Sequence, residues 1–157
     1  MNKKILKAIE KVILNGKFIL GDELRAWENE VAQYYHKKYA IGVNSGTDAL
    51  LLSLKAVGIK QGDEVITTPF TFISPAEMIA QCGAKPVFVD INYDDFLINP
   101  DLILGNDMIF SDAPFQFGTA TITNKTKAIL PIHLFGQSCD KRIKKIAQKY
   151  KLWVIED

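Results

Sequence analysis

The chain has 157 residues, 48% of them hydrophobic and 24% charged, with 19 basic residues nearly balanced by 18 acidic ones for a net charge of +1. This composition is typical of one globular domain and indicates neither a nucleic acid nor a membrane as a partner, since no apolar run reaches the ~20 residues of a membrane-spanning helix. Cys82 and Cys139 lack metal-ligand spacing and the N-terminus lacks a signal-peptide core, which favours a reduced, cytoplasmic protein.

The N-terminal residues predict two helices. Apolar side chains at helical spacing predict an amphipathic helix over residues 2–14, ended by Asn15-Gly16. A turn-prone stretch follows, and Asp22 is then a candidate cap for a second helix. One face of this second helix would carry Leu24, Trp27, Val31 and Tyr34 or Tyr35.

From residue 40 onward, predicted strands and helices alternate. Short apolar runs predict strands at residues 40–43, 64–67, 86–90, 127–132 and 152–155. Helices are predicted at residues 47–57, 74–81 and 140–150. This alternation is typical of an α/β fold with a mostly parallel sheet flanked by helices, in which ligands bind at the carboxyl ends of the strands.

Single residues predict how the last two helices begin and which side of the last one is exposed. Ser74 would cap helix 74–81, with Pro75 at the first helical position, and Asp140 would cap the last helix. The inward residues of the last helix would be Ile143, Ile146, Ala147 and Tyr150. Its basic residues have no aromatic residues among them, which predicts a solvated face and not a nucleic-acid site; they are Lys141, Arg142, Lys144, Lys145 and Lys149.

The turn Asn44-Ser45-Gly46-Thr47-Asp48 joins the first predicted strand of the alternating region to its first helix. A helix start leaves backbone N–H groups without partners and carries partial positive charge. Gly46 lets a ligand approach the backbone, and the hydroxyls of Ser45 and Thr47 can add hydrogen bonds, so the turn is suited to a phosphate. Ordinary capping is the alternative, because Ser, Thr and Asp are preferred cap residues.

Two further features fall at the same predicted edge of the sheet, the loop Phe70-Thr71-Phe72 and Asp157. Taken alone, Phe72 indicates core packing and Asp157 a frayed terminal acid. His133 follows a predicted strand, but with only His36 as a second histidine no metal cluster or hydrolase triad is evident. Ser45 has no identifiable base, which argues against a serine nucleophile.

Eight segments of the chain match one known family in the same order: residues 16–21, 43–50, 62–67, 70–72, 83–90, 126–129, 132–137 and 154–157. They resemble the DegT/DnrJ/EryC1/StrS family of pyridoxal-phosphate-dependent sugar-nucleotide aminotransferases, whose large domain has the aspartate aminotransferase fold of type I. The resemblance implies pyridoxal 5′-phosphate as cofactor, a homodimer, and amino transfer from an amino acid, often glutamate, to a nucleotide-linked keto sugar in glycan precursor biosynthesis.

The resemblance also implies roles for single residues. Ser45, Gly46 and Thr47 would bind the cofactor phosphate. Phe72 would lie against the pyridine ring, and Asp157 would pair with the ring nitrogen. His133 would make a structural hydrogen bond and would not be the catalytic base.

The chain departs from the family pattern in two ways. No lysine matches the one that forms a Schiff base with the cofactor, so no catalytic residue is assigned; residues 1–157 would be an N-terminal segment and an incomplete large domain, without the small C-terminal domain. Residues 104–121 would be an insertion, either a tolerated surface loop or a substrate lid. A truncated, non-catalytic remnant that binds a phosphate ligand or a full-length paralogue is the alternative, and a free-standing mononucleotide-binding module is a third hypothesis.

Overall fold

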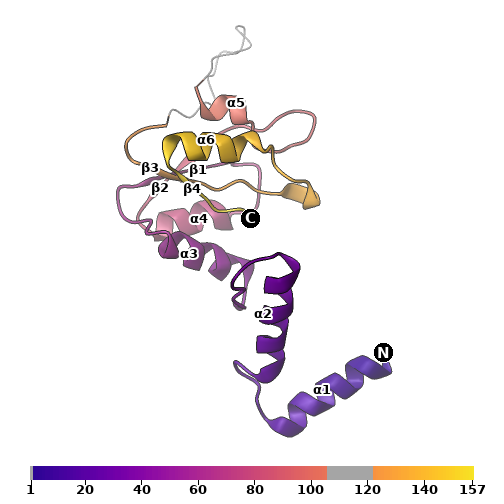
Figure 1. Cartoon of the computed structure of the whole chain (residues 1–157). Helices are drawn as coiled ribbons and strands as arrows, with labels where there is room; N and C mark the ends of the chain where they lie inside the picture. Colours follow the sequence, from indigo (N-terminus) through magenta and orange to yellow (C-terminus); the bar gives the residue numbers. More distant parts are fainter. Residues whose placement is uncertain (1, 106–121) are drawn as a thin grey trace. The chain divides into compact units, whose positions relative to one another are not determined.

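The computed structural model describes residues 2–105 and 122–157, so the predicted insertion at 104–121 lies almost entirely outside the described residues. The chain divides into two compact units, Met1–Asn44 and Ser45–Asp157. Figure 1 shows the helices of the first unit and the sheet of the second. Every residue predicted to bind the cofactor belongs to the second unit.

The first unit contains α1 (Lys3–Asn15) and α2 (Asp22–Tyr34), which confirms both predicted helices. Gly16 ends α1 in the left-handed region, at φ 65°, where glycine is favoured. Asp22 does not cap α2: Gly21 precedes the helix, and the Asp22 carboxylate accepts from Lys17 Nζ at 3.0 Å. The predicted cap was wrong because a lysine five residues earlier binds the carboxylate that would have bonded the helix N–H groups.

The predicted strand at residues 40–43 is wrong. The segment forms no ladder with any described residue, and Tyr39 and Ile41 are 71% and 78% exposed. Its Gly42 N–H donates to Glu28 Oε1 of α2 at 2.7 Å. An apolar run becomes a strand only when a neighbouring strand accepts and donates its main-chain hydrogen bonds, which no described residue does here.

The second unit is built on a four-stranded, fully parallel sheet in the order β2–β1–β3–β4. This confirms the α/β fold class and four of the five predicted strands, one with the predicted bounds and three shorter than expected. The strands are β1 (Glu64–Thr67), β2 (Lys85–Phe88), β3 (Thr126–Ile129) and β4 (Trp153–Val154).

Helices cover both faces of this sheet (Figure 1). α3 (Gly46–Ala56) and α4 (Ser74–Gln81) pack on one face; α5 (Pro100–Ile103) and α6 (Arg142–Tyr150) pack on the other. A 3₁₀ turn, η1 (Leu134–Gly136), follows β3. Within residues 2–105 and 122–157, every helix is too short or too polar to span a bilayer.

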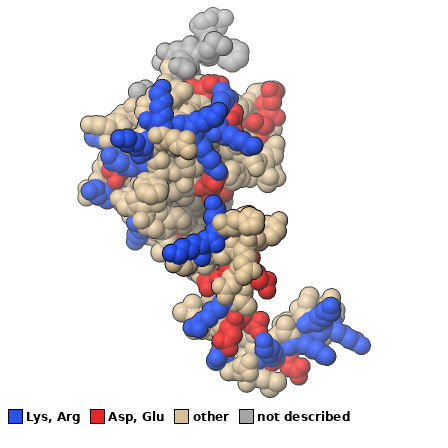
Figure 2. All heavy atoms as spheres, viewed as in Figure 1, with Lys and Arg blue, Asp and Glu red and all other residues tan. Residues whose placement is uncertain are grey.

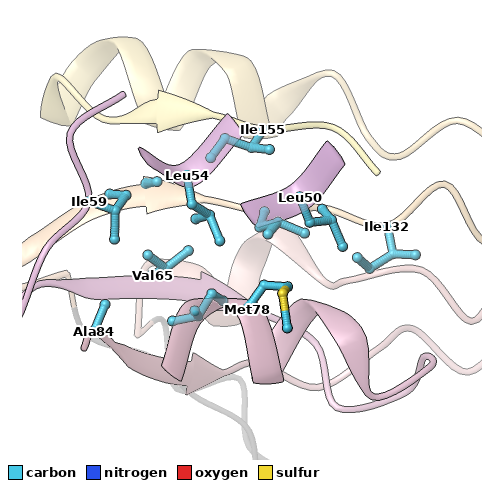
Figure 3. Packing of buried hydrophobic residues seen from close by; sticks show 11 residues of the cluster. Leu50, Leu54, Ile59, Val65, Met78, Ala84, Ile132 and Ile155 are labelled. Atoms are coloured by element: carbon cyan, nitrogen blue, oxygen red, sulfur yellow. The ribbon is translucent and has the colours of Figure 1, made fainter. Parts of the chain in front are cut away.

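The two central strands, β1 and β3, each divide their side chains between two hydrophobic clusters. Val65 lies in the cluster with α3 and α4, whereas its neighbour Ile66 lies in the cluster with α5 and α6. Ala128 and Ile129 divide in the same way. Figure 3 shows the first cluster. Successive side chains of a strand point to opposite faces of the sheet, and here helices cover both faces. Apolar residues are therefore needed at successive positions, which explains the continuous apolar runs in the sequence.

The predicted helix starts were partly wrong. Ser74 is the first residue of α4 and is buried, and Ile73 precedes the helix without a side-chain cap. Lys141 precedes α6, but Asp140 Oδ1 does accept the Arg142 N–H at 2.8 Å, so the expected hydrogen bond forms one residue away from the cap position. Ser74 does not occupy the cap position because the helical backbone begins one residue earlier than predicted, with Ile73 already in the right-handed helical region.

The predicted faces of α6 are confirmed except for Tyr150. Ile143, Ile146 and Ala147 are buried, but Tyr150 is 40% exposed. Figure 2 shows the Lys and Arg side chains gathered over α6, all of them exposed as predicted for a solvated face: Lys141, Arg142, Lys144, Lys145 and Lys149.

Candidate functional site

The start of α3 is built by the expected capping residue. Ser45 has extended backbone, and its Oγ accepts the Asp48 N–H at 3.1 Å while lying 3.2 Å from Asp48 Oδ2. The capping interpretation of Ser45 is therefore confirmed. Because this hydroxyl is used within the helix, an anion at this turn would depend chiefly on main-chain N–H groups.

Gly46 and Thr47 supply those groups. Among the described residues, neither main-chain N–H has a hydrogen-bond acceptor. A Cβ atom placed on Gly46 would meet no atom within 4 Å, so the backbone is open to a ligand. In Figure 3 Leu50, in the first half of α3, lies beside Ile132, whereas Leu54 lies farther back along the sheet. The helix start therefore points to the carboxyl edge of the strands.

The loop after β1 places Phe72 at the same edge. Phe72 is 74% exposed and borders a shallow hollow, so the core-packing interpretation of Phe72 is wrong. The rest of this loop is braced: the Phe70 N–H donates to Thr68 Oγ1 at 3.2 Å, and the Phe70 ring stacks on Phe96 with centroids 5.7 Å apart. Thr68 and Phe88 also line the hollow.

The pairing of β3 with β4 continues beyond the assigned strands and fixes Asp157. The Ile155 N–H donates to Ile129 O at 3.0 Å, the Asp157 N–H to Pro131 O at 3.1 Å, and the His133 N–H to Asp157 O at 2.8 Å. Pro131 has no N–H to donate to the intervening carbonyl, so one bond of the ladder is missing. Asp157 is thus an ordered continuation of β4 and not a frayed acid.

The alternation along β4 separates the last two acids. Ile155 packs in the α3–α4 cluster, so Glu156 faces α6 and Asp157 faces the α3 side. Glu156 Oε1 indeed lies 3.2 Å from Lys144 Nζ of α6 and 3.4 Å from His133 Nε2. Asp157 therefore occupies the sheet face on which α3 begins.

Electrostatics distinguish Asp157 from the other acids of the site. Partial burial raises the pKa of the Asp157 carboxyl above its ordinary value, and the nearby His133 side chain opposes that rise. His133 itself makes the expected structural hydrogen bond, since its Nδ1 accepts the Cys139 N–H at 3.0 Å. The described residues contain no group of three or more His, Cys, Asp or Glu side chains arranged to hold a metal ion.

The predicted site residues thus lie on three segments at one edge of the sheet: the start of α3, the loop after β1 and the end of β4. No hydrogen bond joins these segments directly among the described residues. Sequence reasoning missed Lys144 and Phe96 as supporting residues. For Glu156 alone the sequence offered a signal. Side chains alternate between the faces of a strand, so Glu156 and Asp157 could be expected to face opposite sides of the sheet.

Known proteins resemble this chain in sequence and in fold. The model of the DegT/DnrJ/EryC1/StrS aminotransferase family matches residues 1–157. The chain is 41% identical to a pleiotropic regulatory protein of Geobacillus stearothermophilus over 100% of its own length and 38% of the relative's. It is 41% identical to UDP-2-acetamido-2-deoxy-3-oxo-D-glucuronate aminotransferase of Pseudomonas aeruginosa, over 98% of the chain and 39% of the relative.

A third relative and a solved structure with a bound cofactor both come from Bacillus subtilis. The chain is 39% identical to 3-oxo-glucose-6-phosphate:glutamate aminotransferase of Bacillus subtilis, over 98% of the chain and 32% of the relative. The crystal structure of NtdA from Bacillus subtilis with bound pyridoxamine phosphate superposes with a TM-score of 0.84 at 38% identity, over 97% of the chain and 32% of NtdA. The chain thus spans less than two fifths of the length of these relatives.

Proposed function

Because the chain belongs to the DegT/DnrJ/EryC1/StrS aminotransferase family, we propose that it supplies the cofactor-binding edge of a pyridoxal-phosphate-dependent sugar aminotransferase. The observation that carries the proposal is the open start of α3, with two main-chain N–H groups free of acceptors among the described residues, on the same sheet face as Asp157. In this proposal unit Ser45–Asp157 belongs to the large domain of the enzyme.

The residues of this edge match the parts of the cofactor in chemical type. The N–H groups of Gly46 and Thr47, with the Thr47 hydroxyl, would hold the phosphate, and Ser45 would hold the helix start that orients them. The exposed ring of Phe72 would lie against the pyridine ring. When bound, pyridoxal phosphate supplies an electron sink for a carbanion formed on the substrate.

Asp157 would hold a proton on the ring nitrogen. Burial disfavours the charged form of this carboxyl, which raises its pKa. A positively charged ring N–H beside the carboxylate offsets that cost, because opposite charges in a partly desolvated site favour both ionised forms. The site therefore favours a protonated ring over a neutral one.

The substrate and donor follow from what the relatives are named for. One acts on a UDP-linked keto sugar and another uses glutamate, so we propose a nucleotide-linked keto sugar as acceptor and glutamate as donor, in the formation of glycan precursors. The proposal includes a homodimer in the cytoplasm, as the family resemblance implies. No lysine of this sequence is assigned to the Schiff base, so the test measures binding and not turnover.

The test is calorimetric titration of the chain with pyridoxamine 5′-phosphate, whose amine cannot form Schiff bases with surface lysines. We expect one site per chain, and about ten- to hundredfold weaker binding of pyridoxamine, which lacks the charged phosphate. Asp157→Asn should weaken binding, whereas Asp94→Asn, at an exposed position, should not. Equal binding of both ligands, or no binding, would refute the proposal.

The mononucleotide-binding hypothesis gives a different result in the same experiment, because such a module would bind UDP and not pyridoxamine phosphate. A non-catalytic remnant would bind pyridoxamine phosphate as the proposed fragment does, so the titration tests the cofactor site and does not separate these two hypotheses.

A further inference from the structure

A connected set of polar groups lies on the α6 face of the sheet, opposite the face on which the cofactor is proposed to bind. Lys144 Nζ lies 3.2 Å from Glu156 Oε1, which in turn lies 3.4 Å from His133 Nε2. The other ring nitrogen, His133 Nδ1, accepts the Cys139 N–H at 3.0 Å. All four residues line one pocket between the end of the sheet and α6.

These contacts select one form of the imidazole ring. Because Nδ1 accepts a main-chain N–H, it carries no proton, and the proton of the neutral ring is on Nε2. That proton faces the Glu156 carboxylate, which Lys144 holds from the other side. The ring therefore donates toward β4 and accepts from the loop after η1.

His133 also holds Asp157 through its main chain. Its N–H donates to Asp157 O at 2.8 Å, so one residue contacts Asp157 by its backbone and Glu156 by its side chain. The ladder between the two chain segments lacks one bond because Pro131 has no N–H. The side-chain contacts on the α6 face restrain the strand end where the main-chain ladder is incomplete.

We propose that His133 is a positioning residue, which together with Glu156 and Lys144 clamps the end of β4 so that the Asp157 carboxylate stays on the α3 face. The importance of Asp157 for the cofactor rests on the proposed function; the clamp itself does not. His133 acts on the opposite face and is not a catalytic residue in this account. With the clamp lost, Asp157 would be free to leave the orientation in which it faces the start of α3.

The test follows amide hydrogen exchange in the chain by NMR. His133→Phe keeps the main-chain donor but removes both side-chain contacts of the ring. We expect the Asp157 amide to exchange about tenfold faster, which corresponds to a loss of roughly 1.4 kcal/mol in the free energy of local opening. The Leu130 amide, which donates to Ile66 O at 2.7 Å, should be unchanged and so reports that the sheet remains folded.

A control variant and a second test variant complete the test. His36→Asn changes the other histidine at a position with φ 51°, which asparagine tolerates, and should leave Asp157 exchange unchanged. If His133→Phe does not fold, Lys144→Met replaces it, with Lys145→Met on the same helix as its control. We expect a smaller, roughly threefold increase for Lys144→Met alone.

The outcomes separate this proposal from the proposed function. Unchanged exchange of the Asp157 amide in a folded His133→Phe chain, or a neutral His133 ring with its proton on Nδ1, overturns the clamp. Failure of the unaltered chain to bind pyridoxamine phosphate overturns the proposed function and leaves the exchange result standing. Both proposals are supported when faster exchange at Asp157 accompanies weaker binding of pyridoxamine phosphate.

Discussion

Glu156 and Asp157 are adjacent in the chain but face opposite sides of the sheet. Glu156 binds Lys144 and His133 on the α6 side, at 3.2 and 3.4 Å. Asp157 follows the direction of Ile155, which packs in the cluster under α3. A strand alternates its side chains, so two neighbouring acids can contact groups on opposite sides of the sheet without competing for the same partners.

Replacing Ser45 by alanine should destabilise the chain through α3. The substitution removes the hydroxyl that accepts the Asp48 N–H at 3.1 Å, and the loss of such a cap costs about 1 kcal/mol in the free energy of unfolding. Urea unfolding of Ser45→Ala measures this cost. Ser53→Ala, the same change inside α3, should have little effect; equal losses in the two variants would contradict the capping role.

Gly46→Ala should separate folding from binding. A methyl group there meets no atom within 4 Å, so the free energy of unfolding should stay the same or rise by up to ~1 kcal/mol. The methyl would, however, occupy the open approach to the helix start, and the affinity for pyridoxamine phosphate should fall in the calorimetric titration. Gly58→Ala is the contrast, because its φ of 83° makes alanine strained and should cost ~1–2 kcal/mol.

Core packing under α3 predicts a large loss for Leu54→Ala. Leu54 is fully buried in the α3–α4 cluster (Figure 3), and truncation of such a side chain costs about 2–5 kcal/mol. Leu52 lies two residues away on the same helix and is 51% exposed, so Leu52→Ala should cost far less in the free energy of unfolding. Urea unfolding of both variants provides the measurement, and similar losses would show that α3 does not pack as described.

Asp157 should lower the free energy of unfolding as pH rises from 3.8 through the raised pKa of the folded chain. Its pKa is raised on folding from an ordinary 3.8, so the folded chain binds more protons than the unfolded chain between that value and the raised one. The favourable contribution is complete below 3.8 and is lost as pH rises through the folded pKa. Relative to the unaltered chain, Asp157→Asn should therefore gain stability across this window, as measured by urea unfolding at a series of pH values.

Asp140 provides a control of opposite sign. Hydrogen bonds from the Arg142 main chain and side chain lower the pKa of Asp140. Its stabilising contribution is present above the ordinary value of 3.8 and is lost as pH falls through the lowered folded pKa. Asp140→Asn should thus lose stability at neutral pH relative to the unaltered chain; a pH dependence of the same sign as at Asp157 would contradict both assignments.

The Cys139 thiol should react slowly. Burial raises its pKa to about 11, and its Sγ donates to Ile132 O at 3.0 Å. In a Cys82→Ser chain, which leaves Cys139 as the remaining cysteine, the rate of alkylation by iodoacetamide should keep rising tenfold per pH unit up to about pH 10. A free thiol with a pKa of ~8.5 levels off near pH 9; a plateau there would contradict the raised pKa.

The sequence predicted the fold class and most elements because their signals are local. Apolar runs alternating with helical spacing indicated a parallel sheet, and the cap formed by Ser45 was visible three residues from its partner Asp48. The strand expected at 40–43 failed for the complementary reason: an apolar run specifies that a segment can pair, and not whether a neighbour is present.

The sequence predicted residues for the candidate site but not the arrangement of their side chains. The sequence by itself determined that Gly46, Phe72 and Asp157 follow helix and strand boundaries that meet at one edge of a parallel sheet. Only the tertiary structure decided that Asp157 faces α3 while Glu156 is held by His133, a residue 23 positions away in the chain. Contacts of that kind depend on strand register and on helix packing, which bring together groups that no local pattern relates.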